Sequence, residues 1–363
     1  MHLLKYQLLP NFGINYGYTV KSPYSTSFRP ACTKEEINDA YDGMLCEFFE
    51  EKHMLLYERN HSIITCEDHY SMPIFSFFNE PCEKMLDTSW YDLKCTTFVK
   101  AYCAENILNM EESKKESFVL VPEEAAVFHD FWDVSDRKSI HWSNSNGYAH
   151  SNSIRRALIK ATSEIVENHV KMKWWFSECN IYLIDNGNVL RKYVDDKDIF
   201  VGSFLIDNFS LYNSYVCMTV ICFKKSNRIY MGFGCNVSVN KSWEHSWNEA
   251  INSFRGVSWY ELTHYDYKYD NELYEDVVAK LNRTYTGTVT MDSLGNFNEE
   301  AVFNKHSFYY IPVNNDGIGY TLRVISSEFQ PLVSNQFVPF YLAGFNSEYS
   351  KRLREKYKGV PFI

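Results

Sequence analysis

The sequence lacks the features that mark several large classes of protein. It contains 10 cysteines but no CxxC pair and no histidine grouped with them at zinc-ligand spacing, so we expect reduced core thiols rather than a zinc site. Its longest apolar runs, such as 215–223, have about nine residues, far fewer than the roughly 20 that cross a bilayer. The first residues show no basic segment followed by a sustained apolar one, so no signal peptide is expected. These absences favour a cytoplasmic protein.

Basic residues are outnumbered by acidic ones. The chain of 363 residues carries 36 Lys and Arg against 46 Asp and Glu, a formal net charge of -10. On average such a surface repels nucleic-acid phosphates and anionic lipid heads, so we expect neither nucleic acid nor a membrane as a partner. Apolar residues make up 45% and aromatic residues 17%, which excludes a disordered chain and predicts a folded protein.

Strand patterns dominate the chain, and no linker divides them. Because no stretch is rich in Pro, Gly or Ser, we favour one domain over residues 1–363. Apolar, β-branched and aromatic runs predict strands at 62–66, 117–121, 180–185, 200–206, 215–223, 228–233, 286–291, 307–313 and 320–326. Many are separated by turns of hairpin length, such as 225–227, which favours a largely antiparallel sheet.

Three segments show helical spacing instead. The first begins at Thr33, which forms a capping-box pattern with Glu36, and continues to about residue 56. The second runs from about 151 to 174 with an apolar stripe, and the third has Ser242 as its N-cap and ends near residue 256. Because strands and helices are mixed without the regular alternation of a doubly wound parallel sheet, the predicted fold class is α+β.

Each of these helices carries a pair of oxygen-bearing side chains on one face. The pairs lie three residues apart: Glu47 and Glu50, Glu164 and Glu167, and Glu249 and Asn252. Like charges at this spacing repel by a few tenths of a kcal/mol unless a cation lies between them. One such pair is usually a solvated helix face, but five carboxylates on converging faces would bind hard cations or take up protons. Magnesium with a nucleotide triphosphate would suit them without a glycine-rich loop, and the sequence has neither a GxxxxGK motif nor a GxGxxG motif.

The loop before the second pair resembles the central motif of YcaO-domain proteins. That motif joins a small-residue loop, with Ser-Asn-Gly and a later Asn, to a helix with Glu-x-x-Glu, and residues 145–152 and 164–167 match it. Residues 43–53 look like the family's first Glu-x-x-Glu helix, and residues 232–252 look like its third motif, where Glu-x-x-Gln is expected. The three motifs follow the family's order.

Within that family the resemblance is closest to the ATP-using subunit of microcin-type azole synthetases. The first helix there has a similar pattern, matched here by Gly43, Glu47, Phe48, Phe49, Glu50, Lys52 and His53. The chain there ends in a Val-Pro-Phe-Pro type of tail, and this one ends in residues 359–363, Gly-Val-Pro-Phe-Ile.

The resemblance implies a YcaO-like fold around a nucleotide, with ATP and Mg²⁺ as cofactors. By position, the metal ligands would be Glu47, Glu50, Glu164, Glu167 and Glu249. Nucleotide or phosphate contacts would come from Asn152, Arg156, His245, Asn252 and Lys34, with Arg29 as an alternative to Lys34. The tail residues Pro361, Phe362 and Ile363 would be catalytic if they fold back to the nucleotide. The structural alternatives are a solvated cation for Lys34, a partly buried helix histidine for His245 and a disordered terminus for the tail.

Several positions depart from the family pattern. Glu51 and Asn168 stand where an Arg often follows the Glu-x-x-Glu pairs, and Arg156 stands where an additional acidic residue is expected. Replacing a carboxylate by Arg removes a potential ligand and adds a cation, so the site would hold fewer ions or use Arg156 on phosphate directly. Asn252 is one methylene shorter than the expected Gln, and Ile363 replaces the final Pro.

The activity implied by the resemblance is that of an ATP-dependent cyclodehydratase in bacteriocin-type peptide biosynthesis. It would form thiazoline or oxazoline rings from Cys, Ser or Thr of a ribosomal precursor peptide. We expect a heteromeric synthetase, with an E1-like or ocin-ThiF-type leader-binding partner and a flavin-dependent dehydrogenase. Two alternatives stay open. The same fold makes thioamides or amidines, and a non-catalytic scaffold subunit would also retain it.

Overall fold

The computed structural model describes residues 2–6, 15–19, 31–34, 36–56, 64–65, 97–105, 118–122, 146–185, 194–195, 197–262, 271–315, 317–330, 345 and 347–357. Arg29 and the tail residues Pro361, Phe362 and Ile363 lie outside these described residues. Among the helices within them, none combines the length and apolar character that a membrane crossing requires.

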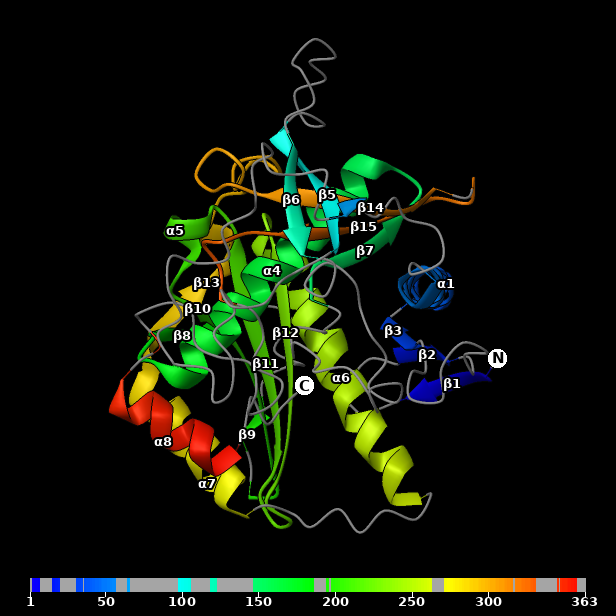
Figure 1. Cartoon of the computed structure of the whole chain (residues 1–363). Coiled ribbons are helices and arrows are strands. Elements are labelled where there is room, and N and C mark those ends of the chain that lie inside the picture. The colour runs from blue at the N-terminus through cyan, green and yellow to red at the C-terminus, as the bar shows by residue number, and fades with distance from the viewer. Residues whose placement is uncertain are drawn as a thin grey trace.

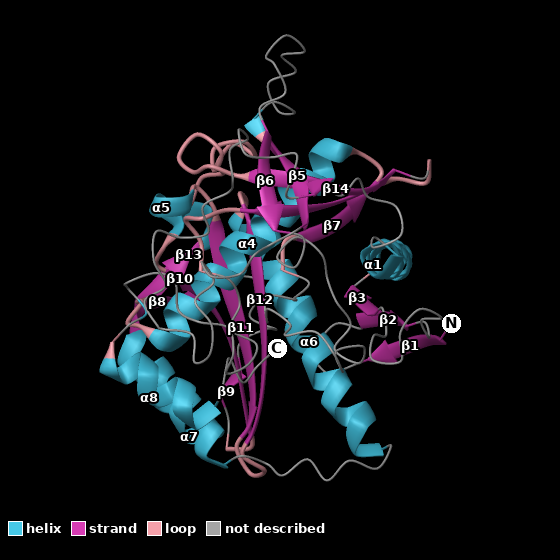
Figure 2. Ribbon diagram, viewed as in Figure 1, coloured by secondary structure: helices cyan, strands magenta, loops and turns pink. Residues whose placement is uncertain are grey.

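The described strands form three sheets, which Figure 2 shows as separate groups. The first is antiparallel, in the order β1-β2-β3, with β1 at His2–Tyr6, β2 at Asn15–Thr19 and β3 at Ala31–Lys34. The second has the order β4-β5-β14-β15-β7, with β6 paired to β5. Its strands are β4 (Ile64–Thr65), β5 (Thr97–Cys103), β6 (Phe118–Pro122), β7 (Tyr148–Ser151), β14 (Tyr309–Asn315) and β15 (Tyr320–Ile325).

The third sheet has the order β12-β11-β10-β8-β13, with the short strand β9 paired to β10. Its strands are β8 (Ile181–Asp185), β9 (Val194–Asp195), β10 (Ile199–Ile206), β11 (Tyr215–Phe223), β12 (Arg228–Asn236) and β13 (Tyr285–Thr290). All its pairs are antiparallel except β13 with β8, which is parallel. The predicted mixed class with largely antiparallel sheets is therefore confirmed.

Helices cover the sheets and connect them. They are α1 (Ile37–Leu56), α4 (Ile154–Phe176), α5 (Phe209–Tyr212), α6 (Val239–Leu262), α7 (Asn271–Thr284) and α8 (Glu348–Tyr357), with a 3-10 turn η6 at Met291–Ser293. Figure 1 shows α6 running alongside β12, with α1 and the β1–β3 sheet beyond it. The edge strand β12 is thereby next to the helices that carry the acidic pairs.

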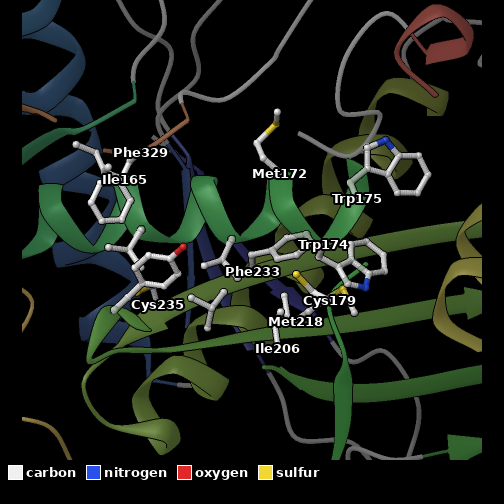
Figure 3. Close-up of a cluster of buried hydrophobic side chains, with 14 of the residues drawn as sticks. Ile165, Met172, Trp174, Trp175, Cys179, Ile206, Met218, Phe233, Cys235 and Phe329 are labelled. Atoms are coloured by element: carbon white, nitrogen blue, oxygen red, sulfur yellow. The ribbon is translucent and has the colours of Figure 1, made fainter. Parts of the chain in front are cut away.

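Helix α4 packs on one face of the third sheet. Its apolar stripe, including the fully buried Trp174 and Phe176, lies in one hydrophobic cluster with Met218 of β11 and Phe233 of β12. Figure 3 shows Trp174 of α4 close to Phe233, with Met218 nearby on the sheet. Burying a large apolar side chain contributes about 1.5–3 kcal/mol, so this interface holds α4 firmly in place.

Helix α6 packs on the opposite face of the same sheet. Successive side chains of a strand point to opposite faces, so neighbouring residues of β11 show which helix lies on each face. Trp247 of α6 clusters with Ile221 of β11, whereas the neighbouring Cys222 lies in the cluster on the α4 side. The approach is close because β12 presents glycine here. A Cβ built on Gly232 would lie 2.1 Å from the backbone nitrogen of Ala250 in α6.

Two predicted helix starts are wrong. Thr33 is not an N-cap: it belongs to β3, paired with β2, and α1 begins only at Ile37. Ser242 lies inside α6, where its hydroxyl is 2.6 Å from the carbonyl oxygen of Gly234 and accepts a hydrogen bond from the backbone N–H of Cys217. In both cases contacts with distant strands outweigh the local capping preference.

A pH-dependent stability is expected from Lys280 of α7. Its side chain is 1% exposed, and burial lowers its pKa from the ordinary 10.5 to about 8. Between these two values the unfolded chain binds more protons than the folded one. The free energy of unfolding therefore rises with pH in this interval, by up to about 3 kcal/mol from this group.

Urea unfolding of the wild type and of Lys280→Met, measured between pH 7 and 10.5, isolates this effect from the other titrating groups. We expect the stability difference between the two proteins to shift in favour of the wild type as the pH rises. Lys241→Met, at an exposed position of α6, is the control. A pH-independent difference for Lys280→Met would contradict the expectation.

Candidate functional site

Acidic side chains of α1, α4 and α6 are linked by ion-pair contacts that run through α4. Helix α4 packs on one face of the third sheet and α6 on the other, and both contact the edge strand β12. The backbone N–H of Cys235 in β12 donates a hydrogen bond to Glu167 of α4 and so ties that carboxylate to the edge. Helix α1 approaches from the side of β3 and β7, with which it is in contact.

Lys160 links α4 to α1. Its Nζ atom lies 3.5 Å from Oε2 of Glu50 and 3.8 Å from Oε1 of Glu47, so one ammonium group reaches both carboxylates of the first pair. The backbone N–H of His150, in β7, also donates to Glu50. Both carboxylates of the first pair therefore contact α4, and Glu50 is the more buried of the two.

His245 links α4 to α6 in a similar way. Its Nδ1 atom lies 3.8 Å from Oε2 of Glu167, and its Nε2 atom lies 3.7 Å from Oε1 of Glu249. One imidazole ring thus lies between carboxylates of the second and third pairs. The helix face predicted for His245, one turn before Glu249, is the one observed.

The five glutamates are close enough for their charges to affect one another. Burial raises the pKa of Glu164 well above its ordinary value, and the negative charges of Glu50 and Glu167 raise it further. Burial also raises the pKa of Glu50, to about 7, with Glu47 adding to the effect and Lys160 opposing it. A carboxylate held among like charges in this way favours a bound cation or a proton.

Near Glu167 and Glu249, cationic side chains offset more of the negative charge. Burial raises the pKa of Glu167, although His245 and Lys171 act against it. Burial would also raise the pKa of Glu249, but the neighbouring imidazole of His245 and the charge of Lys34 bring it below its ordinary value. Lys34 of β3 is thus close enough to the third pair to act on it.

An external ligand can reach this cluster. Glu50 and Glu167 are the deeper members, with side chains 14% and 13% exposed. The exposed fraction is 47% for Glu47, Lys160 and Glu249 and 44% for His245. The outer carboxylates therefore remain available to solvent while the inner ones are held by protein contacts.

The remaining predicted contacts are less closely tied to the cluster. Asn152 is exposed between β7 and α4, Arg156 is exposed on the first turn of α4, and Asn252 is half-buried on α6 one turn after Glu249. Among the residues that the structure describes, no ion pair joins Arg156 to these carboxylates. The structure thus brings together the five glutamates, His245 and Lys34.

Two lysines of the site were not predicted from the sequence. Lys160, Glu164, Glu167 and Lys171 follow one another at spacings of four, three and four residues, which places them on one face of α4. Lys171 is buried, and its Nζ atom lies 5.0 Å from the ring centroid of Phe233. A lysine one turn before and one turn after the glutamate pair, on the same helix face, was the available signal.

The cluster fits Mg²⁺ in its chemistry. Carboxylate oxygens are the ligands that this hard cation prefers, and the mutual repulsion around Glu164 favours a cation. As they stand, no three His, Cys, Asp or Glu side chains in the described part of the chain are close enough to hold a metal ion. Metal binding therefore requires the carboxylates to draw together, and Lys160 lies among them.

The sequence matches a family model described as YcaO cyclodehydratase, ATP- and Mg²⁺-binding, over residues 83–305. This match covers more than half of the chain, which therefore belongs to the YcaO family. ATP and Mg²⁺ are accordingly its cofactors, and the protein is an ATP-dependent enzyme of this family. No curated protein matches the sequence.

Solved structures show the same fold. YcaO from Methanopyrus kandleri, bound with AMPPCP and Mg²⁺, superposes with a TM-score of 0.64 at 16% identity, covering 94% of this chain and 89% of that one. A chain of the E. coli microcin synthetase McbBCD complex gives 0.69 at 13% identity, with 99% and 96% covered. A heterocyclase in complex with substrate and cofactor gives 0.63 at 11% identity, with 92% and 50% covered. At such identities these likenesses establish the YcaO-like fold.

Proposed function

We propose that this enzyme is an ATP-dependent cyclodehydratase that forms thiazoline or oxazoline rings in a ribosomal precursor peptide. The observation that carries the proposal is the convergence of acidic pairs from α1, α4 and α6 on one electrostatically coupled, solvent-accessible cluster. Cyclodehydration needs a nucleotide triphosphate held by such a cluster beside a peptide amide. No ring forms unless the amide oxygen becomes a good leaving group.

The chemistry divides between the cofactors and the chain. ATP with Mg²⁺ would supply the phosphoryl group that converts the amide oxygen of the substrate into phosphate, after a Cys, Ser or Thr side chain has attacked the preceding carbonyl. The proposed metal ligands are Glu47, Glu50, Glu164, Glu167 and Glu249. Their carboxylates would set the position of the triphosphate relative to the peptide.

The surrounding cations and amides would bind the nucleotide itself. We propose Lys34, Arg156 and His245 as phosphate contacts, because each carries or can accept a positive charge on or near the cluster. Asn152 and Asn252 would donate amide hydrogen bonds to the nucleotide. The tail residues Pro361, Phe362 and Ile363 are proposed, on the family resemblance, to act in catalysis.

The proposed substrate and partners follow from the structural neighbours. One neighbour is the McbBCD complex with pro-MccB17 bound, and another is a heterocyclase in complex with substrate. These complexes support a peptide substrate and a multisubunit assembly for the present chain as well. We propose a leader-binding partner of the E1-like or ocin-ThiF type, and a flavin-dependent dehydrogenase that oxidises the azolines.

Mass spectrometry of the peptide tests the function. The chain, its partner and a precursor peptide rich in Cys and Ser are incubated with ATP and Mg²⁺, and phosphate release is measured in parallel. We expect the peptide to lose the mass of one water molecule for each phosphate released. A sulfide-dependent replacement of oxygen by sulfur would indicate thioamide formation instead, and ATP binding without any change in the peptide would indicate a scaffold.

A further inference from the structure

Neither the family motifs nor the proposed function assigns a role to Lys160, which lies within 4 Å of both carboxylates of the first pair. It projects from α4 one turn before Glu164, on the same face, and its ammonium group reaches α1. Its contacts are with one oxygen of each carboxylate, Oε1 of Glu47 and Oε2 of Glu50. Glu50 also accepts a hydrogen bond from the backbone N–H of His150, whereas Glu47 remains 47% exposed.

Lys160 carries a positive charge at neutral pH. A lysine side chain has an ordinary pKa of about 10.4, and the carboxylates of Glu47 and Glu50 lie within 4 Å of this ammonium group. The ammonium group therefore remains protonated throughout the neutral range. Since it also acts on the pKa of Glu164, a single positive charge serves the first pair and the centre of the cluster.

The residue one turn before Lys160 on α4 is also a cation. Arg156 lies four residues before Lys160 on α4, where the family pattern has an acidic residue. Two successive turns of this helix thus carry cations, one of them at a position where the family pattern has a carboxylate. Because the side chain of Lys160 is 47% exposed, its ion pairs contribute little to stability. We therefore expect Lys160 to affect the binding of divalent cations to these carboxylates rather than the stability of the fold.

We propose that the ammonium group of Lys160 takes the place of one divalent cation between α1 and α4. This inference rests on the proposed role of the glutamates as metal ligands. In this chain the first pair is neutralised by the protein itself, so that fewer divalent ions accompany the nucleotide than five carboxylates could hold. A divalent ion brought to the same oxygens must displace or repel the lysine.

Manganese binding to the full chain, without ATP or peptide, tests this inference. Free Mn²⁺ is measured by electron paramagnetic resonance during titration of the wild type, Lys160→Gln and Lys160→Arg. We expect Lys160→Gln to bind one more Mn²⁺ than the wild type, or to bind Mn²⁺ about tenfold more tightly, because a positive charge has been removed from beside the ligands. Lys160→Arg keeps the charge and should behave as the wild type does.

Two further variants complete the design. Lys241→Gln removes an exposed lysine of α6 and should leave Mn²⁺ binding unchanged. Glu50→Gln combined with Lys160→Gln removes the lysine together with one ligand, and should return Mn²⁺ binding to the wild-type level. Lys160→Met serves as a second neutral variant if Lys160→Gln does not fold, because it keeps an unbranched side chain.

Equal Mn²⁺ binding by the wild type and Lys160→Gln would overturn the inference, and so would an equal change in Lys160→Gln and Lys160→Arg. Absence of Mn²⁺ binding in all variants would overturn it as well. The peptide assay is a separate measurement. If the peptide is not dehydrated but Lys160→Gln gains an Mn²⁺ ion, the proposed reaction fails and the inference about Lys160 stands.

Discussion

Glu164→Gln is expected to abolish phosphate release stimulated by the peptide, by about a hundredfold or more, while leaving the fold intact. Glu164 is the centre of the cluster, coupled to Glu50, Glu167 and Glu47 and to Lys160. Glutamine keeps the shape of the side chain but removes the charge that a metal ligand at this position would supply. Losing one positioned electrostatic contact in an active site typically costs a factor of 10² to 10³.

Unlike phosphate release, the free energy of unfolding should not fall in Glu164→Gln. Because burial and like charges raise the pKa of Glu164, the ionised form destabilises the folded chain when no cation is bound. Removing this charge should leave the free energy of unfolding in EDTA unchanged or higher. Urea unfolding and a phosphate-release assay on the same preparation would measure both effects.

Glu178→Gln is the matched control, because Glu178 lies just after the end of α4 and its side chain is 77% exposed. It should affect neither measurement. Wild-type phosphate release by Glu164→Gln would remove Glu164 from the site. A large loss of stability in EDTA would show instead that its charge holds the helices together.

Gly234→Ala should prevent α6 from reaching its place on the sheet. A Cβ at this position would lie 2.3 Å from the backbone oxygen of Ser242 and 2.6 Å from the backbone nitrogen of Ser246, both in α6. These are backbone atoms, so no side-chain rotation relieves the overlap and the whole helix must shift. Overpacking of a core typically costs 1–3 kcal/mol, and we expect a loss of about 3 kcal/mol or more here.

The displaced helix carries His245 and Glu249, so nucleotide binding should be lost together with stability. Urea unfolding followed by circular dichroism, and calorimetric titration with a non-hydrolysable ATP analogue and Mg²⁺, would measure the two effects. Gly287→Ala is the control, because Gly287 also lies in a strand but has no atom within 4 Å of an added Cβ. Equal stability of the two variants would show that the contact between α6 and β12 tolerates a methyl group.

Elements with strong local periodicity could be predicted from the sequence. The strand expected at 215–223 is β11, and the second motif helix, α4, was predicted near its observed limits. The third, α6, extends beyond its predicted limits at both ends. Helices α7 and α8 were missed. The sequence predicts helix caps at Thr33 and Ser242 because their immediate neighbours favour capping. In the structure Thr33 pairs with β2 as part of β3, and the hydroxyl of Ser242 donates a hydrogen bond to the carbonyl oxygen of Gly234 in β12.

The sequence by itself determined which faces of the three helices carry oxygen ligands, because a spacing of three residues fixes a helix face whatever the surroundings. Only the tertiary structure decided that these faces meet and that protein cations lie among them. Lys160 and Glu50 are 110 residues apart, and nothing in the local pattern of either helix specifies their contact. Helices α4 and α6 pack on opposite faces of the third sheet, and α1 packs against β3 and β7. This packing brings the acidic side chains together because it outweighs the repulsion between their charges.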